Sequence, residues 1–318
     1  MTQANPTHHT NTNKSSITQT ISTEIKSVSF IGLGAMGYLM ATHLVGKFDT
    51  VMVYNRTSAK AEQHAKEFGS QAVSLEQAAT ADVIFSCLPT SNEVDAIIAK
   101  VLPHIHSGSV WVDCTSGVPA QAKAANTKLQ QQGCYFLDAP VSGQTTGAKA
   151  GTLTVMVGGE AQALNHAYPA IDCFAGLIEH VGASGAGFAV KAVNNTLFAI
   201  NAWACAEGLS VLKAHGVNPS SALTCINHSS GQSMASSNTF PNRIINRQFP
   251  KTFTIDLMAK DCGIAMDLQS EKKLPTPVMA QVASLIRAAS MQHDIGSADF
   301  SEFAKFYESW TTLTLQDE

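Results

Sequence analysis

Residues 28–37 read Val-Ser-Phe-Ile-Gly-Leu-Gly-Ala-Met-Gly, and residues 38–45 continue as a predicted helix. Gly-x-Gly-x-x-Gly between a strand and a helix is the context in which these glycines bind a dinucleotide. Gly32 permits a tight turn, Gly34 lets the backbone approach a pyrophosphate, and Gly37 lets the helix pack closely on the strand. Free N–H groups at the helix start favour the phosphates. The predicted cofactor-binding turn comprises Gly32, Leu33, Gly34, Ala35, Met36 and Gly37.

Short apolar runs alternate with helical stretches from Val28 to about Val181. Such alternation implies βαβ units and a mostly parallel sheet. From Phe188 onward no strand is predicted, and Phe188 to about His215 predict a single helix, roughly 42 Å long, that would run between two domains. The pattern predicts an α/β fold, namely a Rossmann-type, doubly wound, mostly parallel sheet followed by an all-α C-terminal domain.

The chain divides into three predicted parts. Residues 1–26 are rich in Thr, Asn, Gln and Ser and lack an apolar signal-peptide core, so we expect a disordered tail. Residues 27–186 are assigned to the dinucleotide-binding Rossmann domain. Residues 187–318 are assigned to a helical domain for substrate binding and dimerisation, and glycines at 182, 185 and 187 mark the boundary.

The composition narrows the class of protein. A net charge of -4 over 318 residues offers no basic field for nucleic acid. No apolar run approaches the roughly 20 residues of a membrane helix, so no membrane association is expected. The 7 cysteines are scattered and form no Cys-x-x-Cys pair, which favours free thiols in the cytoplasm. His104 and His106 lack neighbouring ligands, and no metal site is predicted.

The end of the second predicted strand bears on the choice of cofactor. Enzymes that use NAD usually carry a carboxylate there for the ribose 2′-hydroxyl. This chain has Asn55-Arg56-Thr57 instead. Arg56 can pair with a 2′-phosphate through its planar guanidinium, and Asn55 and Thr57 can add hydrogen bonds. A solvated Arg56 at a helix start is the alternative. The residues favour NADP, with NAD still possible.

Asp138 to Gly143 end another predicted strand and enter a glycine-rich stretch at 147–151. A turn at the carboxyl end of a parallel strand lies where α/β proteins bind ligands. The Ser142 hydroxyl and nearby N–H groups could bind a substrate carboxylate, although the same residues could form a structural turn.

Lys191 and Asn195 are four residues apart in the long helix and therefore share one face. Their apolar neighbours Val190, Val193 and Leu197 are expected to desolvate that face. Burial lowers the pKa of a lysine, and a lysine near neutrality can move a proton to or from a substrate oxygen. Taken alone, Lys191 could equally be a surface residue.

These motifs together resemble the β-hydroxyacid dehydrogenase family, which includes 3-hydroxyisobutyrate dehydrogenases and tartronate and succinic semialdehyde reductases. The resemblance extends over nearly all of the chain after the tail. The matching stretches, in the family's order, are Gly32 to Gly37, Cys87 to Thr90, Asp113 to Ser116, Asp138 to Gly143, Gly147 to Leu153, Lys191 to Asn195, and Lys260-Asp261.

The resemblance implies a hydride transfer between NADP(H) and a small 3-hydroxy acid or its semialdehyde. It implies that Lys191 is the catalytic acid/base and that Asn195 orients the substrate. A further set would bind ligands: Ser142 and Gly143 at the substrate carboxylate, beside Gln144, and Leu88, Pro89, Thr115 or Ser116, and Lys260 at the cofactor. The family implies a homodimer or homotetramer.

Two departures from the family pattern are present. The family often has Ser-Gly-Gly where this chain has Ser142-Gly143-Gln144, which alters the predicted carboxylate pocket. The usual Ser-Thr order is inverted at Thr115-Ser116, which leaves open which hydroxyl meets the cofactor.

Three other readings remain. Imine reductases with a similar fold generally lack a lysine at this position. A 6-phosphogluconate dehydrogenase would be expected to have a histidine where Asn194 stands, and a longer helical domain. A non-catalytic NAD(P)-binding sensor or assembly protein would be expected to lose the lysine.

Overall fold

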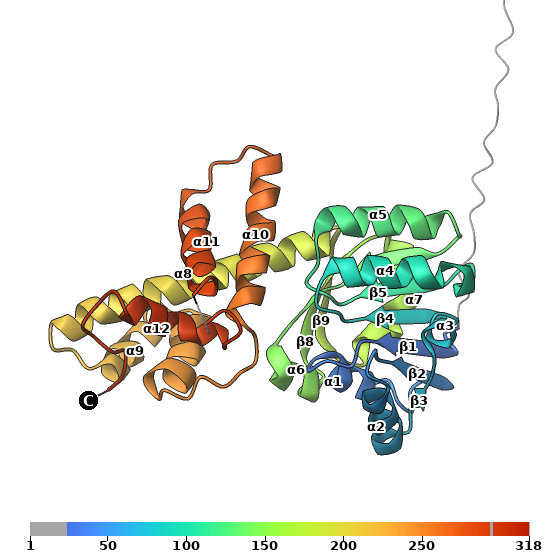
Figure 1. Cartoon of the computed structure of the whole chain (residues 1–318), viewed down its shortest axis with the longest axis horizontal. Helices are drawn as coiled ribbons and strands as arrows, with labels where there is room; N and C mark the ends of the chain where they lie inside the picture. The colour runs from blue at the N-terminus through green and yellow to red at the C-terminus, as the bar shows by residue number, and fades with distance from the viewer. Residues whose placement is uncertain (1–23, 293–294, 318) are drawn as a thin grey trace, which may run out of the picture.

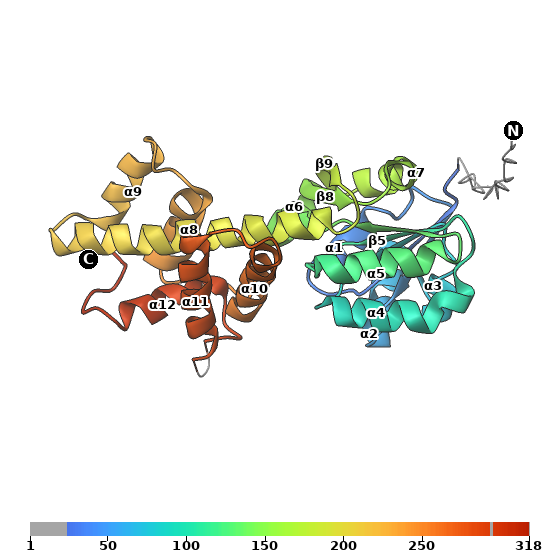
Figure 2. The ribbon, with the colours of Figure 1, turned by 90° about the horizontal axis from the view of Figure 1, so that it is seen from above.

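The computed structural model describes residues 24–292 and 295–317. The predicted tail at 1–26 lies outside these residues, apart from Glu24 to Lys26. The described chain forms a sheet-containing domain and a helical domain, and one long helix extends from the first through the second (Figures 1 and 2).

The first domain contains a single sheet. Its strands lie in the order β3-β2-β1-β4-β5-β6-β8-β7, and β9 pairs with β8. Neighbours from β3 to β6 are parallel, β8 runs antiparallel to β6 and β7, and β9 is parallel to β8. The predicted Rossmann-type, mostly parallel sheet is therefore confirmed. The strands are β1 (Ser27–Ile31), β2 (Thr50–Tyr54), β3 (Gln71–Ala72), β4 (Val83–Ser86), β5 (Val110–Asp113), β6 (Tyr135–Asp138), β7 (Val141–Ser142), β8 (Leu153–Gly158) and β9 (Ala175–Gly182).

Helices cover both faces of this sheet. Alternate residues of a strand point to opposite faces, so Phe30 and Phe85 enter one core while Ile31 and Ile84 enter the other. The first core is closed by α1 and α7, and the second by α4 and α5. The helices and the 3-10 turn η1 are α1 (Gly37–Thr42), α2 (Ser58–Phe68), α3 (Leu75–Ala78), α4 (Ser91–Val101), η1 (Leu102–His104), α5 (Pro119–Gln130), α6 (Gln144–Ala150) and α7 (Ala161–Asp172).

The long helix α8 (Ala186–Ala214) has 29 residues and begins two residues before the predicted Phe188. Buried Asp138, at the end of β6, fixes its start. The Asp138 carboxylate accepts hydrogen bonds from the backbone N–H of Gly185 at 2.7 Å and of Phe188 at 3.0 Å. A Cβ on Gly187 would lie 2.3 Å from the Met156 carbonyl oxygen. The first turn of α8 is thereby held against the carboxyl edge of the sheet.

The helical domain packs around α8. Its core includes Trp203 and Leu209 of α8, with Phe240 and Phe303 from later elements. In the described residues after α8, the β-structure is limited to an isolated bridge between Thr254 and Asp299. Across the described ranges, no helix is long and apolar enough to cross a membrane. The remaining elements are α9 (Pro219–Asn227), the π-helix η2 (Ala235–Ile245), α10 (Ile255–Glu271), α11 (Pro277–Ser290), the 3-10 helix η3 (Phe300–Glu302) and α12 (Phe303–Glu308).

Candidate active site

The glycine turn has the geometry that a bound pyrophosphate requires. Gly32 has φ +98°, and a Cβ there would lie 2.4 Å from the Cys87 carbonyl oxygen. A Cβ on Gly37 would lie 2.0 Å from the Gly32 carbonyl oxygen. A Cβ on exposed Gly34 would meet no atom within 4 Å. The fold itself requires the outer two glycines, whereas the middle one leaves open space beside the backbone. Of the other turn residues, Leu33 is buried, Met36 half-buried and Ala35 exposed.

The end of β2 lies against this turn. Asn55 Oδ1 accepts a hydrogen bond from the Leu33 N–H at 3.0 Å, and Asn55 Nδ2 donates to the Thr57 carbonyl at 3.1 Å. The Asn55 amide therefore braces the glycine turn, a role that the sequence did not indicate. Arg56 and Thr57 are exposed beside it. The structure thus brings together the two segments that were predicted to contact the dinucleotide.

Residues 88–89 and 115–116 follow β4 and β5, two neighbouring strands of the same sheet edge. Thr115 is buried, and its hydroxyl accepts a hydrogen bond from the Leu88 N–H at 3.1 Å. Ser116 is half-buried and Pro89 is exposed. The Thr115 hydroxyl therefore joins the two loops internally, which leaves Ser116 as the more accessible hydroxyl.

Asp113 supports these loops from beneath. Its carboxylate accepts hydrogen bonds from the Ser86 hydroxyl at 2.9 Å and the Thr115 N–H at 3.1 Å. Burial raises the pKa of Asp113 to about 6, against the opposing effect of these hydrogen bonds.

Lys260 of α10 connects the helical domain to the predicted cofactor loops. Its ammonium donates to the Ser116 carbonyl at 2.5 Å and lies 3.3 Å from Asp261 Oδ1. The contact joins residues that are 144 positions apart. Lys260 is thus placed at the loop where the resemblance implied that it closes over the cofactor.

Lys191, Asn195 and Asp261 form a buried polar group between α8 and α10. Their exposed fractions are 9%, 8% and 1%. Asn195 Nδ2 donates to Asp261 Oδ2 at 2.6 Å. Burial lowers the pKa of Lys191, the charge of Asp261 opposes this shift, and the charge of Lys260 adds to it. The group combines a desolvated amine with a fixed amide and a carboxylate, which are suitable parts for proton transfer to a bound oxygen.

The predicted cause of this burial was wrong. Val190, Val193 and Leu197 are 40%, 38% and 51% exposed, so they lie on the outer face of α8. Burial comes instead from α10, because neighbouring Ala192 packs against Ile264 and Ala265. The error arose because both faces of this helix are apolar, so the sequence does not reveal which face is covered.

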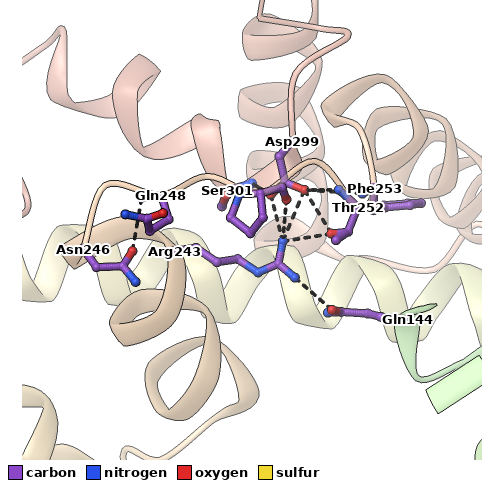
Figure 3. Close-up of polar contacts among 9 residues, drawn as sticks. Gln144, Arg243, Asn246, Gln248, Thr252, Phe253, Asp299 and Ser301 are labelled. Carbon is purple, nitrogen blue, oxygen red and sulfur yellow. Dashed lines mark hydrogen bonds and ion pairs between the residues drawn. The ribbon is translucent and has the colours of Figure 1, made fainter. Parts of the chain in front are cut away.

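The predicted substrate loop joins β7 to α6. Ser142 is half-buried, Gly143 has φ +136°, and exposed Gln144 has φ +58°. The glycine-rich stretch that follows folds as α6. Gln144 Oε1 accepts a hydrogen bond from Arg243 Nη2 at 2.9 Å, a contact between the two domains (Figure 3). The sequence analysis did not identify Arg243. It quoted Asp261 only as part of a motif, without a role.

Comparison with known proteins identifies the family. Residues 27–182 match the model described as the NAD binding domain of 6-phosphogluconate dehydrogenase. Residues 185–307 match the model described as NAD-binding of NADP-dependent 3-hydroxyisobutyrate dehydrogenase. A 2-(hydroxymethyl)glutarate dehydrogenase from Eubacterium barkeri is 33% identical over 91% of this chain and 97% of its own length. The chain belongs to the β-hydroxyacid dehydrogenase family.

Other relatives agree with this assignment. An NAD-dependent L-serine dehydrogenase from Pseudomonas aeruginosa is 33% identical over 89% of this chain and 98% of its own length. The solved 3-hydroxyisobutyrate dehydrogenase of Mycobacterium tuberculosis with L-serine is 30% identical, covers 89% of this chain and 99% of its own, and has a TM-score of 0.82. This family member is accordingly an NAD(P)-dependent hydroxyacid dehydrogenase, as the resemblance implied. An imine reductase from Bacillus cereus, at 18% identity and TM-score 0.57, shares the fold.

Proposed function

We propose that this dehydrogenase transfers a hydride between NADP(H) and a small 3-hydroxy acid or its semialdehyde, with Lys191 as general acid/base. The observation that carries the proposal is the burial of Lys191 beside Asn195 and Asp261. A buried ammonium is costly unless the site uses it or compensates it. This expense is difficult to explain in a non-catalytic cofactor-binding protein.

The chemistry of each step can be assigned to the chain's own groups. When bound, the nicotinamide supplies or accepts the hydride. In oxidation, neutral Lys191 removes the proton from the substrate hydroxyl as the C–H bond breaks. In reduction, protonated Lys191 gives a proton to the carbonyl oxygen. Asn195, held by Asp261, orients that oxygen, while Ser142 and the Gly143 N–H receive the substrate carboxylate.

The NADP preference rests on the end of β2. Asn55 stands where a carboxylate would bind the ribose of NAD, and exposed Arg56 can pair with a 2′-phosphate. Arg56→Ala should weaken NADPH binding by about tenfold or more and leave NADH binding nearly unchanged, since a charge-assisted hydrogen bond is worth about 1.5–3 kcal/mol. Titration of cofactor fluorescence measures both. Equal losses for the two cofactors would contradict the preference.

The activity test is a spectrophotometric screen of C3 and C4 semialdehydes and hydroxy acids with both cofactors. Lys191→Ala should lower turnover by roughly 10²- to 10⁴-fold, the usual range for a general acid or base. Lys66→Ala, which removes an exposed lysine of α2, is the matched control. Unchanged turnover in the folded Lys191 variant would rule out its proposed role.

We further propose a homo-oligomer in the cytoplasm. The outer face of α8 exposes Val190, Leu197 and Val211, a row of apolar side chains suited to burial against a second copy. All seven cysteines are free thiols, which suits a reducing compartment. Light scattering coupled to gel filtration should give a mass of two or four chains, and a single-chain mass would contradict the assembly.

A further inference from the structure

A buried arginine of the helical domain reaches the substrate loop of the sheet domain. Arg243 of η2 is only 6% exposed. Its Nη1 donates to the Pro250 carbonyl at 3.1 Å, to Thr252 Oγ1 at 2.8 Å and to Asp299 Oδ1 at 3.2 Å. Its Nη2 points the other way, and within the described part of the chain its one hydrogen-bond partner is Gln144 Oε1 (Figure 3).

Asp299 does not depend on Arg243 alone for its stability. It accepts hydrogen bonds from the Thr252 N–H at 2.8 Å, the Ser301 N–H at 3.1 Å and the Ser301 hydroxyl at 2.6 Å. Burial would raise the pKa of Asp299, but these hydrogen bonds and the charge of Arg243 together lower it. Because neutral donors share the carboxylate, part of the Arg243 charge remains available on the Nη2 side.

The partner on that side is a replaceable one. Gln144 is exposed and offers a neutral amide oxygen. Its backbone has φ +58°, a conformation that glycine adopts readily and other residues rarely do. Glycine is often present here in the family pattern, so the strained backbone points to a use for the glutamine side chain. Gln144 also lies two residues from Ser142, the proposed site of the substrate carboxylate.

We propose that Arg243 Nη2 is a second carboxylate site and that the preferred substrates are hydroxy acids with a carboxylate at each end. The far carboxylate of the substrate replaces Gln144 Oε1 on Arg243. A carboxylate is the better partner, because charge-assisted hydrogen bonds are roughly twice as strong as neutral ones. Gln144 satisfies the buried guanidinium when no substrate is bound. The inference rests on the proposed function, in which Ser142 and Gly143 receive the first carboxylate.

The test uses two unreactive ligands of equal length, glutarate with two carboxylates and pentanoate with one. Calorimetric titration of the NADP⁺-loaded protein should show glutarate binding at least about tenfold more tightly, and added salt should reduce the difference. Equal affinities would overturn the proposal. Because neither ligand reacts, this outcome is separate from the loss or retention of turnover in Lys191→Ala.

Arg243→Lys tests the role of the second guanidinium arm. Lysine has a single ammonium, which Asp299, Thr252 and Pro250 would hold, so no donor remains for the ligand. The glutarate preference should therefore vanish in the folded variant. Arg247→Lys is the matched control, because Arg247 pairs with Glu308 at 2.6 and 3.0 Å on the same domain. The control should keep the preference. Retention of the preference in Arg243→Lys would overturn the assignment.

Gln144→Ala provides a second test at an exposed position, where unfolding is not expected. The alanine removes the oxygen that the ligand must displace. Glutarate should then bind as tightly as to the wild type or more tightly, and pentanoate binding should be unchanged. A loss of the glutarate preference would show that Gln144 itself holds the ligand, which would refute the displacement from Arg243.

Discussion

Substitution of single glycines in the cofactor turn separates folding from cofactor binding. A Cβ on Gly34 would meet no protein atom within 4 Å, and the residue is not among the glycines with positive φ. A Cβ on Gly37 would lie 2.0 Å from the Gly32 carbonyl oxygen and 2.9 Å from the Phe30 ring. Gly34→Ala therefore adds a methyl group to open space, whereas Gly37→Ala forces two backbone segments apart.

The two substitutions should differ in magnitude as well as in kind. Gly34→Ala should leave the free energy of unfolding unchanged or raise it by about 0.4–1 kcal/mol, because alanine restricts the unfolded chain. Its methyl group occupies the space where the pyrophosphate approaches, so one charge-assisted hydrogen bond would be lost, about 10- to 100-fold in Kd. Gly37→Ala should lower the free energy of unfolding by about 3 kcal/mol, the upper part of the range for overpacking.

Urea denaturation and cofactor fluorescence titration measure these two quantities on the same preparations. The expected pattern is a stable Gly34 variant with weak NADPH binding, beside a destabilised Gly37 variant. Wild-type NADPH affinity in Gly34→Ala would refute the reasoning, because the open space beside that residue would then not be the pyrophosphate site.

Two further changes probe the proton-transfer group and its support. Asp261→Asn removes the carboxylate that opposes the lowering of the Lys191 pKa. Since oxidation needs neutral Lys191, the plateau of turnover against pH should begin at lower pH, and an unchanged or alkaline-shifted profile would contradict the coupling. Asp138→Ala leaves the N–H groups of Gly185 and Phe188 without their acceptor. The free energy of unfolding should fall by about 2 kcal/mol in urea denaturation, and a wild-type value would show that Asp138 does not anchor α8.

The sequence by itself determined the features that depend on local pattern. Alternating apolar runs predicted the strands, because buried parallel strands are continuously apolar. The spacing of Gly32, Gly34 and Gly37 predicted the cofactor turn, since those positions forbid or do not tolerate a side chain. The long apolar periodicity predicted α8 to within two residues at its start. Each of these signals lies within one short stretch of chain.

Tertiary structure alone decided which distant side chains meet. Asn195 and Asp261 are 66 residues apart, and Gln144 and Arg243 are 99 apart. No local propensity specifies such pairs, because they depend on how α10 and η2 pack against α8. The same packing decided that Lys191 is buried while Val190 is exposed. Chain neighbours set the shape of each segment, whereas desolvation and charge compensation arise only when separate segments come together.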